Sequence, residues 1–196
     1  MNKLQGFFEL RKSNLPSVPW QKYTPDSPLD PNILWTIRSA VEQGDDLNLP
    51  RKVGVTADEA HTFAKSLMLQ MNKNDMIIYY PYFIAEKSGV IEISNTRTVI
   101  EAVDKDLWNL VTYNKKDVTI IFENDDMNVI GNENFLSADE LNELVDYCVL
   151  CKKKFKSYFT NGSSVFLEWS FACKSDTNKK SIGAPSLVFY EIRTVG

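Results

Sequence analysis

The chain has 196 residues, of which 43% are hydrophobic and 24% are charged, and its formal net charge is −4 at pH 7. This length and composition are typical of a globular protein with a sizeable core, not of a disordered chain. The acidic balance argues against the basic surface that sequence-independent binding to nucleic acid requires, so we expect no nucleic-acid partner. No apolar run reaches the roughly eighteen residues of a membrane-spanning helix, and we expect no membrane partner and a cytoplasmic location.

The first 32 residues contain five prolines. Because proline fixes its own backbone and restricts the residue before it, residues 1–32 are expected to form an extended segment that wraps around a single domain spanning 1–196. A short strand is predicted over residues 33–37, ending at Arg38. An arginine at the end of a buried strand is a common anion contact and equally a common surface residue, so both interpretations stay open. A polar, acidic loop is expected over residues 42–46.

A helix and four strands are predicted for the middle of the chain. The capping box Thr56 to Glu59 opens a helix that runs to about residue 71. The strands, rich in β-branched and aromatic residues, are expected at residues 76–84, 90–93, 98–103 and 117–123. A tight connection at Ser88-Gly89 is expected to join the first two, and Pro81 indicates an edge or a bulge. Residues 107–111 fit a helical turn or a short strand equally.

The clearest predicted element is a helix that begins at the second capping box, Ser137 to Glu140, and continues to about residue 159. Its apolar residues recur at spacings of three and four, which predicts a single stripe packed on a sheet. Cys148 and Cys151 fall on this stripe, so their spacing indicates reduced core thiols and not a zinc or redox pair. Asn161-Gly162 is expected to end the helix.

Two apolar runs, 165–172 and 187–194, predict an antiparallel hairpin with a long loop over residues 174–185. The period of two places Glu168 on the face opposite the large apolar side chains, and places Glu191 and Arg193 together on one face. If the register sets Glu168 beside Glu191, carboxylates about 4 Å apart repel by roughly 4 kcal/mol at an effective dielectric near 20, which a divalent cation or Arg193 would relieve. The alternative is that these charges face solvent on the outer side of the hairpin. The chain as a whole is predicted to be α+β, mostly antiparallel, with two main helices and a C-terminal hairpin.

The order of these segments resembles the N-terminal ATP-grasp nucleotide-binding domain of phosphoenolpyruvate synthase and pyruvate phosphate dikinase. Residues 35–40 resemble that family's strand ending in Arg-Ser-Ser-Ala, and residues 79–90 resemble its strand and Ser-Gly-Val turn beside the adenine pocket. Residues 136–172 are similar to a helix entering a strand of pattern Asp-x-Glu-Trp, and residues 189–194 to a closing strand that reads Gln-x-Arg-Pro. The resemblance covers about residues 33 to 195.

The resemblance implies an ATP-grasp-like fold that binds ATP with Mg²⁺ and can transfer a phosphoryl group. It assigns the metal to the carboxylates of Glu168 and Glu191. It assigns phosphate binding and catalysis to Arg38 and Arg193, and further contacts with the cofactor to Tyr82 and Phe83. These types suit a nucleotide site, since carboxylate oxygens hold Mg²⁺ and arginines neutralise charge on the transferred phosphoryl.

The sequence departs from the family at several of these positions. Phe166 stands where the pattern has its first acid, Lys105 to Trp108 replaces a glycine-rich turn, and Thr194 replaces a proline. These departures leave three interpretations open. One is an ATP-binding protein that can also transfer a phosphoryl group, and another is a non-catalytic protein on the same scaffold that binds a protein partner or a small molecule. The third is a different α+β binding protein whose similarity to the family is a coincidence.

Overall fold

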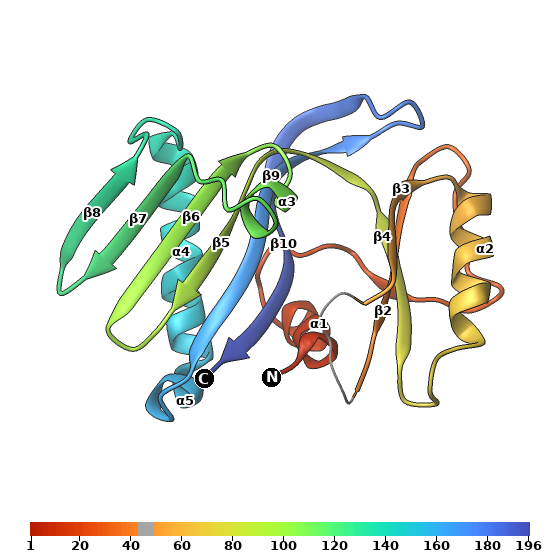
Figure 1. The fold of residues 1–196 in the computed structure, drawn as a ribbon, viewed down its shortest axis with the longest axis horizontal. Helices are drawn as coiled ribbons and strands as arrows, with labels where there is room; N and C mark the ends of the chain where they lie inside the picture. The colour runs from red at the N-terminus through yellow and green to blue at the C-terminus, as the bar shows by residue number, and fades with distance from the viewer. Residues whose placement is uncertain (43–48) are drawn as a thin grey trace.

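The computed structural model describes residues 1–42 and 49–196, which form two antiparallel sheets and the helices that pack on them (Figure 1). The small sheet has the order β1 (Gln21–Lys22), β4 (Met76–Pro81), β2 (Trp35–Ala40), β3 (Arg51–Val55). The large sheet has the order β10 (Ser181–Val195), β9 (Ser164–Ser175), β5 (Phe83–Ile93), β6 (Arg97–Asp104), β7 (Val118–Glu123), β8 (Asp126–Gly131). The predicted α+β class, with its antiparallel pairing and C-terminal hairpin, is confirmed.

The large sheet carries helix α4 (Ala138–Lys154) on one face. The alternation along β9 directs Leu167 and Trp169 into the core beneath this helix, together with Cys148 and Cys151 from the helix itself. Burial raises the pKa of both thiols to about 12, so they are neutral core groups, as the apolar stripe predicted. The helix ends one turn earlier than expected, and the short helix α5 (Lys156–Thr160) follows it.

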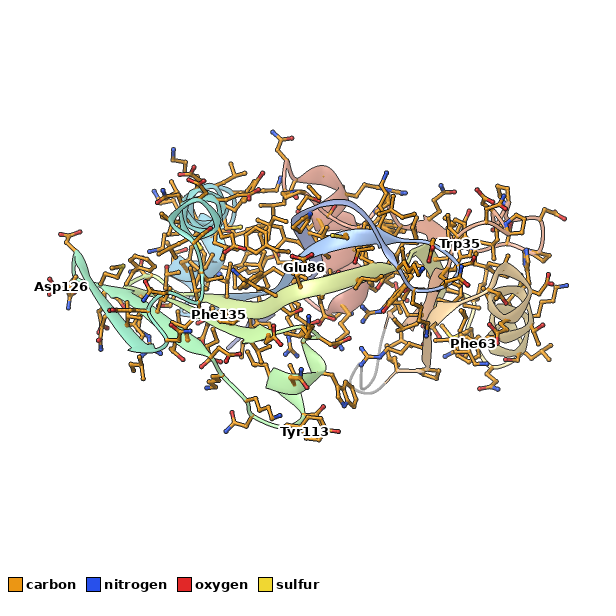
Figure 2. The ribbon with its side chains drawn as sticks, turned by 90° about the horizontal axis from the view of Figure 1, so that it is seen from above. Trp35, Phe63, Glu86, Tyr113, Asp126 and Phe135 are labelled. Carbon is orange, nitrogen blue, oxygen red and sulfur yellow. The ribbon has the colours of Figure 1, made fainter. Side chains whose placement is uncertain are left out.

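The small sheet is covered on its outer face by helix α2 (Ala57–Met68), which the capping box at Thr56 opens as predicted. Trp35, Ile37 and Tyr79 point from β2 and β4 toward this helix. Figure 2 shows Trp35 and Phe63 at this end of the molecule and Asp126 at the far end of the large sheet. The alternate residues of β2 and β4 therefore face the space between the two sheets.

Helix α1 (Lys3–Lys12) fills part of that space, so the prediction of an extended segment over residues 1–32 is wrong for these residues. The prolines that motivated the prediction begin only at Pro16. Asn2 and Gln5 form a capping box, so the helix begins in the part of the segment that precedes the prolines. The helix lies against β10 at Gly6, where a Cβ would fall on the carbonyl oxygen of Ile192.

The chain passes directly from the small sheet into the large one at Pro81 and Tyr82, where β4 ends and β5 begins. The predicted strand 76–84 is thus divided between the sheets, and the predicted tight turn at Ser88-Gly89 is wrong. Both residues lie inside β5, paired with β6 on one side and β9 on the other. Glycine is needed at residue 89 because the indole of Trp169 and the backbone of β6 occupy the place of a side chain.

The hairpin of β9 and β10 is longer than expected, because residues predicted to form its loop continue both strands. The remaining connection, residues 176–180, is stabilised by Asp176, whose carboxylate accepts hydrogen bonds from the backbone of Asn178 and Lys180. The register pairs Glu191 with Glu168, so the two carboxyl groups lie on neighbouring strands at the same level, which is the arrangement considered from the sequence.

The sequence did not predict β3 or β8, and α3 (Trp108–Val111) settles the ambiguous segment 107–111 as a helical turn. Most of the predicted loop 42–46 lies outside the described residues. Among the described residues, no helix is long and apolar enough to cross a membrane.

Candidate functional site

A cavity of about 300 Å³ lies where the two sheets and α3 meet. The small sheet contributes β2, β3 and β4 to its walls, and the large sheet contributes β5, β9 and β10. The side chains that carry its charge and its aromatic surface are Arg38, Arg51, Tyr82, Trp108, Glu168 and Tyr190. The crossing of the chain from β4 into β5 forms part of the wall, since Tyr82 and Phe83 line the cavity. The backbone N–H of Tyr82 donates to the carbonyl oxygen of Leu34 at 2.8 Å, which anchors the crossing to the segment before β2.

Two arginines face this cavity from neighbouring strands of the small sheet. The antiparallel register pairs Arg38 of β2 directly with Arg51 of β3, and both line the cavity. Like charges directly opposite each other in a sheet repel, so this pair concentrates positive charge on one wall. Arg38 is only 7% exposed, whereas Arg51 is exposed at the mouth.

The charge of Arg38 is held by acidic groups around it. Its Nη2 atom donates to Oε2 of Glu191 at 3.3 Å. Burial alone would lower the pKa of Arg38, but the phenol of Tyr80 and then the carboxylate of Glu191 more than reverse this effect, so the pKa stands above its ordinary value. Arg38 is therefore permanently charged despite its burial.

Glu191 is 3% exposed and lies among three cations. Its Oε2 atom is shared by Arg38 and by Lys3 of α1, whose Nζ is 3.6 Å away. Its Oε1 atom lies 3.8 Å from Nε of Arg193 and has no hydrogen-bond partner. The guanidinium of Arg193 also stacks over Phe166, 4.7 Å from the ring centroid. Glu191 thus joins α1, β2 and β10 beneath the cavity.

Glu168 is the second carboxyl group of this cluster and lines the cavity itself. Burial is the main cause that raises its pKa, to about 7, and the neighbouring charge of Glu191 raises it further, against the opposing effect of Arg38. A carboxyl with such a pKa changes its protonation near neutral pH. It can therefore donate a hydrogen bond to a ligand as well as accept one.

The floor of the cavity has a pair of hydroxyl groups, on Ser88 of β5 and Ser170 of β9, 2.7 Å apart. Ser88 donates its proton to the carbonyl oxygen of Lys105 at 2.6 Å, so the bond between the two hydroxyls must be donated by Ser170. Tyr190 lines the cavity next to this pair, and burial raises the pKa of its phenol well above the ordinary value. The floor is thus polar but uncharged.

The opposite wall is formed by α3. Asp106 accepts a hydrogen bond from the backbone N–H of Trp108 at 2.8 Å, which fixes the start of this turn. The indole of Trp108 is 45% exposed at the mouth, and the guanidinium carbon of Arg51 lies 5.3 Å from its ring centroid. A flat ring and a cation therefore stand side by side at the entrance.

The carboxylates do not fit a magnesium site. Magnesium takes six oxygen ligands at about 2.0–2.1 Å, usually from one or two carboxylates together with phosphates and water. Glu191 could serve only by giving up Arg38, Lys3 and Arg193, because both of its oxygens already face cations. Among the described residues, no group of three or more histidine, cysteine, aspartate or glutamate side chains is placed to hold a metal.

The structure brings four of the six sequence-predicted site residues to the cavity: Arg38, Tyr82, Phe83 and Glu168. The other two, Glu191 and Arg193, are not in its lining and instead form the ionic cluster beneath it. Sequence reasoning missed Arg51, Trp108 and the serine pair. The serines had a signal, since each is a small polar residue within an apolar strand, whereas Arg51 required the unpredicted strand β3.

No protein-family model matches the chain, and no curated protein matches it with significance.

Proposed function

We propose that this chain is a non-catalytic, ATP-grasp-like binding protein whose cavity takes a small anion that carries a flat ring, such as a nucleotide. The observation that carries the proposal is the cross-strand pair of Arg38 and Arg51, which face one cavity. Two guanidinium groups placed opposite each other are stabilised by an anion between them, and phosphate is the anion that guanidinium geometry suits best.

The aromatic wall supports a ring on the same ligand. Trp108 offers an accessible indole face at the mouth, and Tyr82 stands across the same cavity. Stacking of a base on an aromatic side chain is typically worth about 1–3 kcal/mol. The volume of about 300 Å³ lies at the lower end of the usual range for small-molecule sites, which favours a compact ligand with few phosphates.

Binding without catalysis is favoured because the carboxylate expected to bind a metal is already paired with cations of the chain. Glu191, which the resemblance made a metal ligand, is neutralised by cations of the chain, and Phe166 occupies the position of the other expected acid. Phosphoryl transfer needs charge stabilisation around the transferred group, usually by magnesium with arginine or lysine. The proposal therefore assigns the arginines to recognition of the ligand.

The test is calorimetric titration of the full chain with AMP, ADP and ATP, supported by thermal unfolding. Ligand at one hundred times its Kd is expected to stabilise the fold by about 2.7 kcal/mol. Trp108→Ala is expected to weaken binding by roughly 5- to 150-fold through lost stacking. Arg51→Gln is expected to weaken it by about tenfold or more through a lost charged hydrogen bond.

Two exposed residues outside the cavity lining serve as matched controls. Tyr113 projects away from both sheets beyond α3 and does not line the cavity (Figure 2), so Tyr113→Ala is expected to leave affinity unchanged. Arg97, exposed at the start of β6, serves as the control for loss of a positive charge. The proposal is refuted if none of the three nucleotides binds at millimolar concentration while the protein is folded.

A further inference from the structure

We propose that the cavity takes its anionic ligand without a divalent cation, because Arg38 and Arg51, supported by Lys3 and Arg193, supply the positive charge that a metal would bring. This inference rests on the proposed function, since it specifies the form in which the ligand binds. It predicts that free nucleotide, and not its magnesium complex, is the species recognised.

The described part of the site carries more positive than negative charge. Among the described residues, the cavity and the cluster beneath it hold four cations, Arg38, Arg51, Lys3 and Arg193, and three carboxyl groups, Asp106, Glu168 and Glu191. One net positive charge remains when every carboxyl is ionised, and two remain when Glu168 is protonated. An anion of one or two charges compensates this excess, whereas a divalent cation that enters alone increases it.

Both carboxylate oxygens of Glu191 already face cations of the chain. Oε2 of Glu191 already lies within 3.6 Å of Lys3 and within 3.3 Å of Arg38, and Oε1 faces Arg193. A magnesium ion bound to either oxygen would sit among these three cations, with Glu168 as the neighbouring carboxyl group. Glu168 lies beside Glu191, and the charges of Arg38, Lys3 and Arg193 act on it as well, so the same cations oppose a metal bound there.

The two arginines of the cavity offer N–H donors to an anion. A guanidinium group has five N–H donors in a fixed plane, and Arg38 uses one nitrogen, Nη2, on Glu191. The guanidinium also interacts with the hydroxyl of Tyr80, and both side chains line the cavity, where a ligand can reach them. Arg51 stands opposite it in the register and is exposed. Two such groups can bind a phosphate through paired hydrogen bonds, which a magnesium complex would hinder by covering the same oxygens.

The experiment is calorimetric titration of the full chain with ATP in excess EDTA and again in excess Mg²⁺. Excess Mg²⁺ leaves little free ATP, so we expect the apparent Kd in Mg²⁺ to be at least about tenfold weaker than the Kd in EDTA, a difference of about 1.4 kcal/mol or more. An equal or lower Kd in Mg²⁺ would overturn this inference. Binding seen only with Mg²⁺ would overturn this inference and leave the proposed function standing. Absence of ATP binding in both buffers would overturn this inference, and the proposed function falls with it if AMP and ADP also fail to bind.

Two further measurements make the result specific to these residues. Mn²⁺ added without nucleotide is expected not to bind, so the paramagnetic resonance signal of the free ion should not decrease. A decrease with the wild-type chain but not with Glu168→Gln would show a metal site at Glu168 and contradict the inference. Lys3→Gln is expected to weaken ATP binding severalfold in EDTA. Lys12→Gln is the matched control, because Lys12 lies on the same helix with a side chain that is 69% exposed and far from the cluster's carboxylates.

Discussion

Replacing Glu191 with glutamine tests the ionic cluster beneath the cavity more directly than any other change. The carboxylate is 3% exposed and balances Arg38, which is itself buried, as well as Lys3 and Arg193. Removing one partner of a buried ion pair typically costs about 3–5 kcal/mol, because the other charge is left without compensation. We expect a loss near 3 kcal/mol, since Glu168 ionises more readily once the neighbouring negative charge is gone and partly replaces it.

Urea unfolding followed by the fluorescence of the four tryptophans measures this loss. For a chain of this size, about 3 kcal/mol corresponds to a decrease in Tm of roughly 6–12 °C. Glu101→Gln is the control, because Glu101 pairs with the more exposed Lys116, and such pairs contribute about 0–1 kcal/mol. A loss below about 1 kcal/mol for Glu191→Gln, at an unchanged m-value, would refute the claim that this carboxylate holds the cluster together.

Three other predictions concern stability. Since burial raises the pKa of Glu168, the folded state binds a proton more tightly than the unfolded state, and the free energy of unfolding should fall as pH rises from about 4.5 through 7. Urea unfolding of Glu168→Gln should lack this decrease, and parallel pH profiles of the wild type and the variant would contradict the prediction. Gly89→Ala should cost about 3 kcal/mol by overpacking, and Gly162→Ala, with a left-handed backbone and open surroundings, only about 1–2 kcal/mol; the reverse order in urea unfolding would be fatal to the packing argument. Ser137→Ala should cost about 1 kcal/mol in the same assay, because its hydroxyl accepts from the backbone of Glu140, and a loss of under a few tenths would show that the cap is dispensable.

Local sequence signals predicted the elements whose stabilising contacts are local. The capping boxes at Thr56 and Ser137 open their helices where expected, because each depends on residues three positions apart. The period of two in the hairpin correctly separated Glu168 from Leu167, since strand geometry alone decides the face. These predictions required no knowledge of the rest of the chain.

The elements that were missed depend on contacts between distant segments. The apolar run from Met76 to Ile84 looks like one strand, and only the arrangement of the two sheets divides it at Pro81. Strand β8 is almost entirely exposed, so it lacks the alternation of apolar and polar residues that a half-buried strand shows. The helix α1 was hidden by the prolines that follow it.

The candidate site was predicted in part for the same reason. Arg38 and Glu168 were named from their strands, and the structure places both at the cavity. Arg51 could not be named as a partner of Arg38, because their pairing depends on a register that no local pattern reveals. The role of Lys3 depends on the packing of α1 against β10, which the sequence alone does not indicate.

The ion pair between Arg38 and Glu191 joins positions 153 residues apart, and this separation has a consequence for biosynthesis. If the small sheet formed while the ribosome was still making the intervening segments, Arg38 would have no counterion from β10. Helix α1 is equally unsupported, since a ten-residue helix is marginal alone and its resting place has not yet been made. Strands that pair over such distances also close slowly. We therefore expect the nascent chain to remain open to chaperones until β10 leaves the exit tunnel, and to acquire both sheets nearly together.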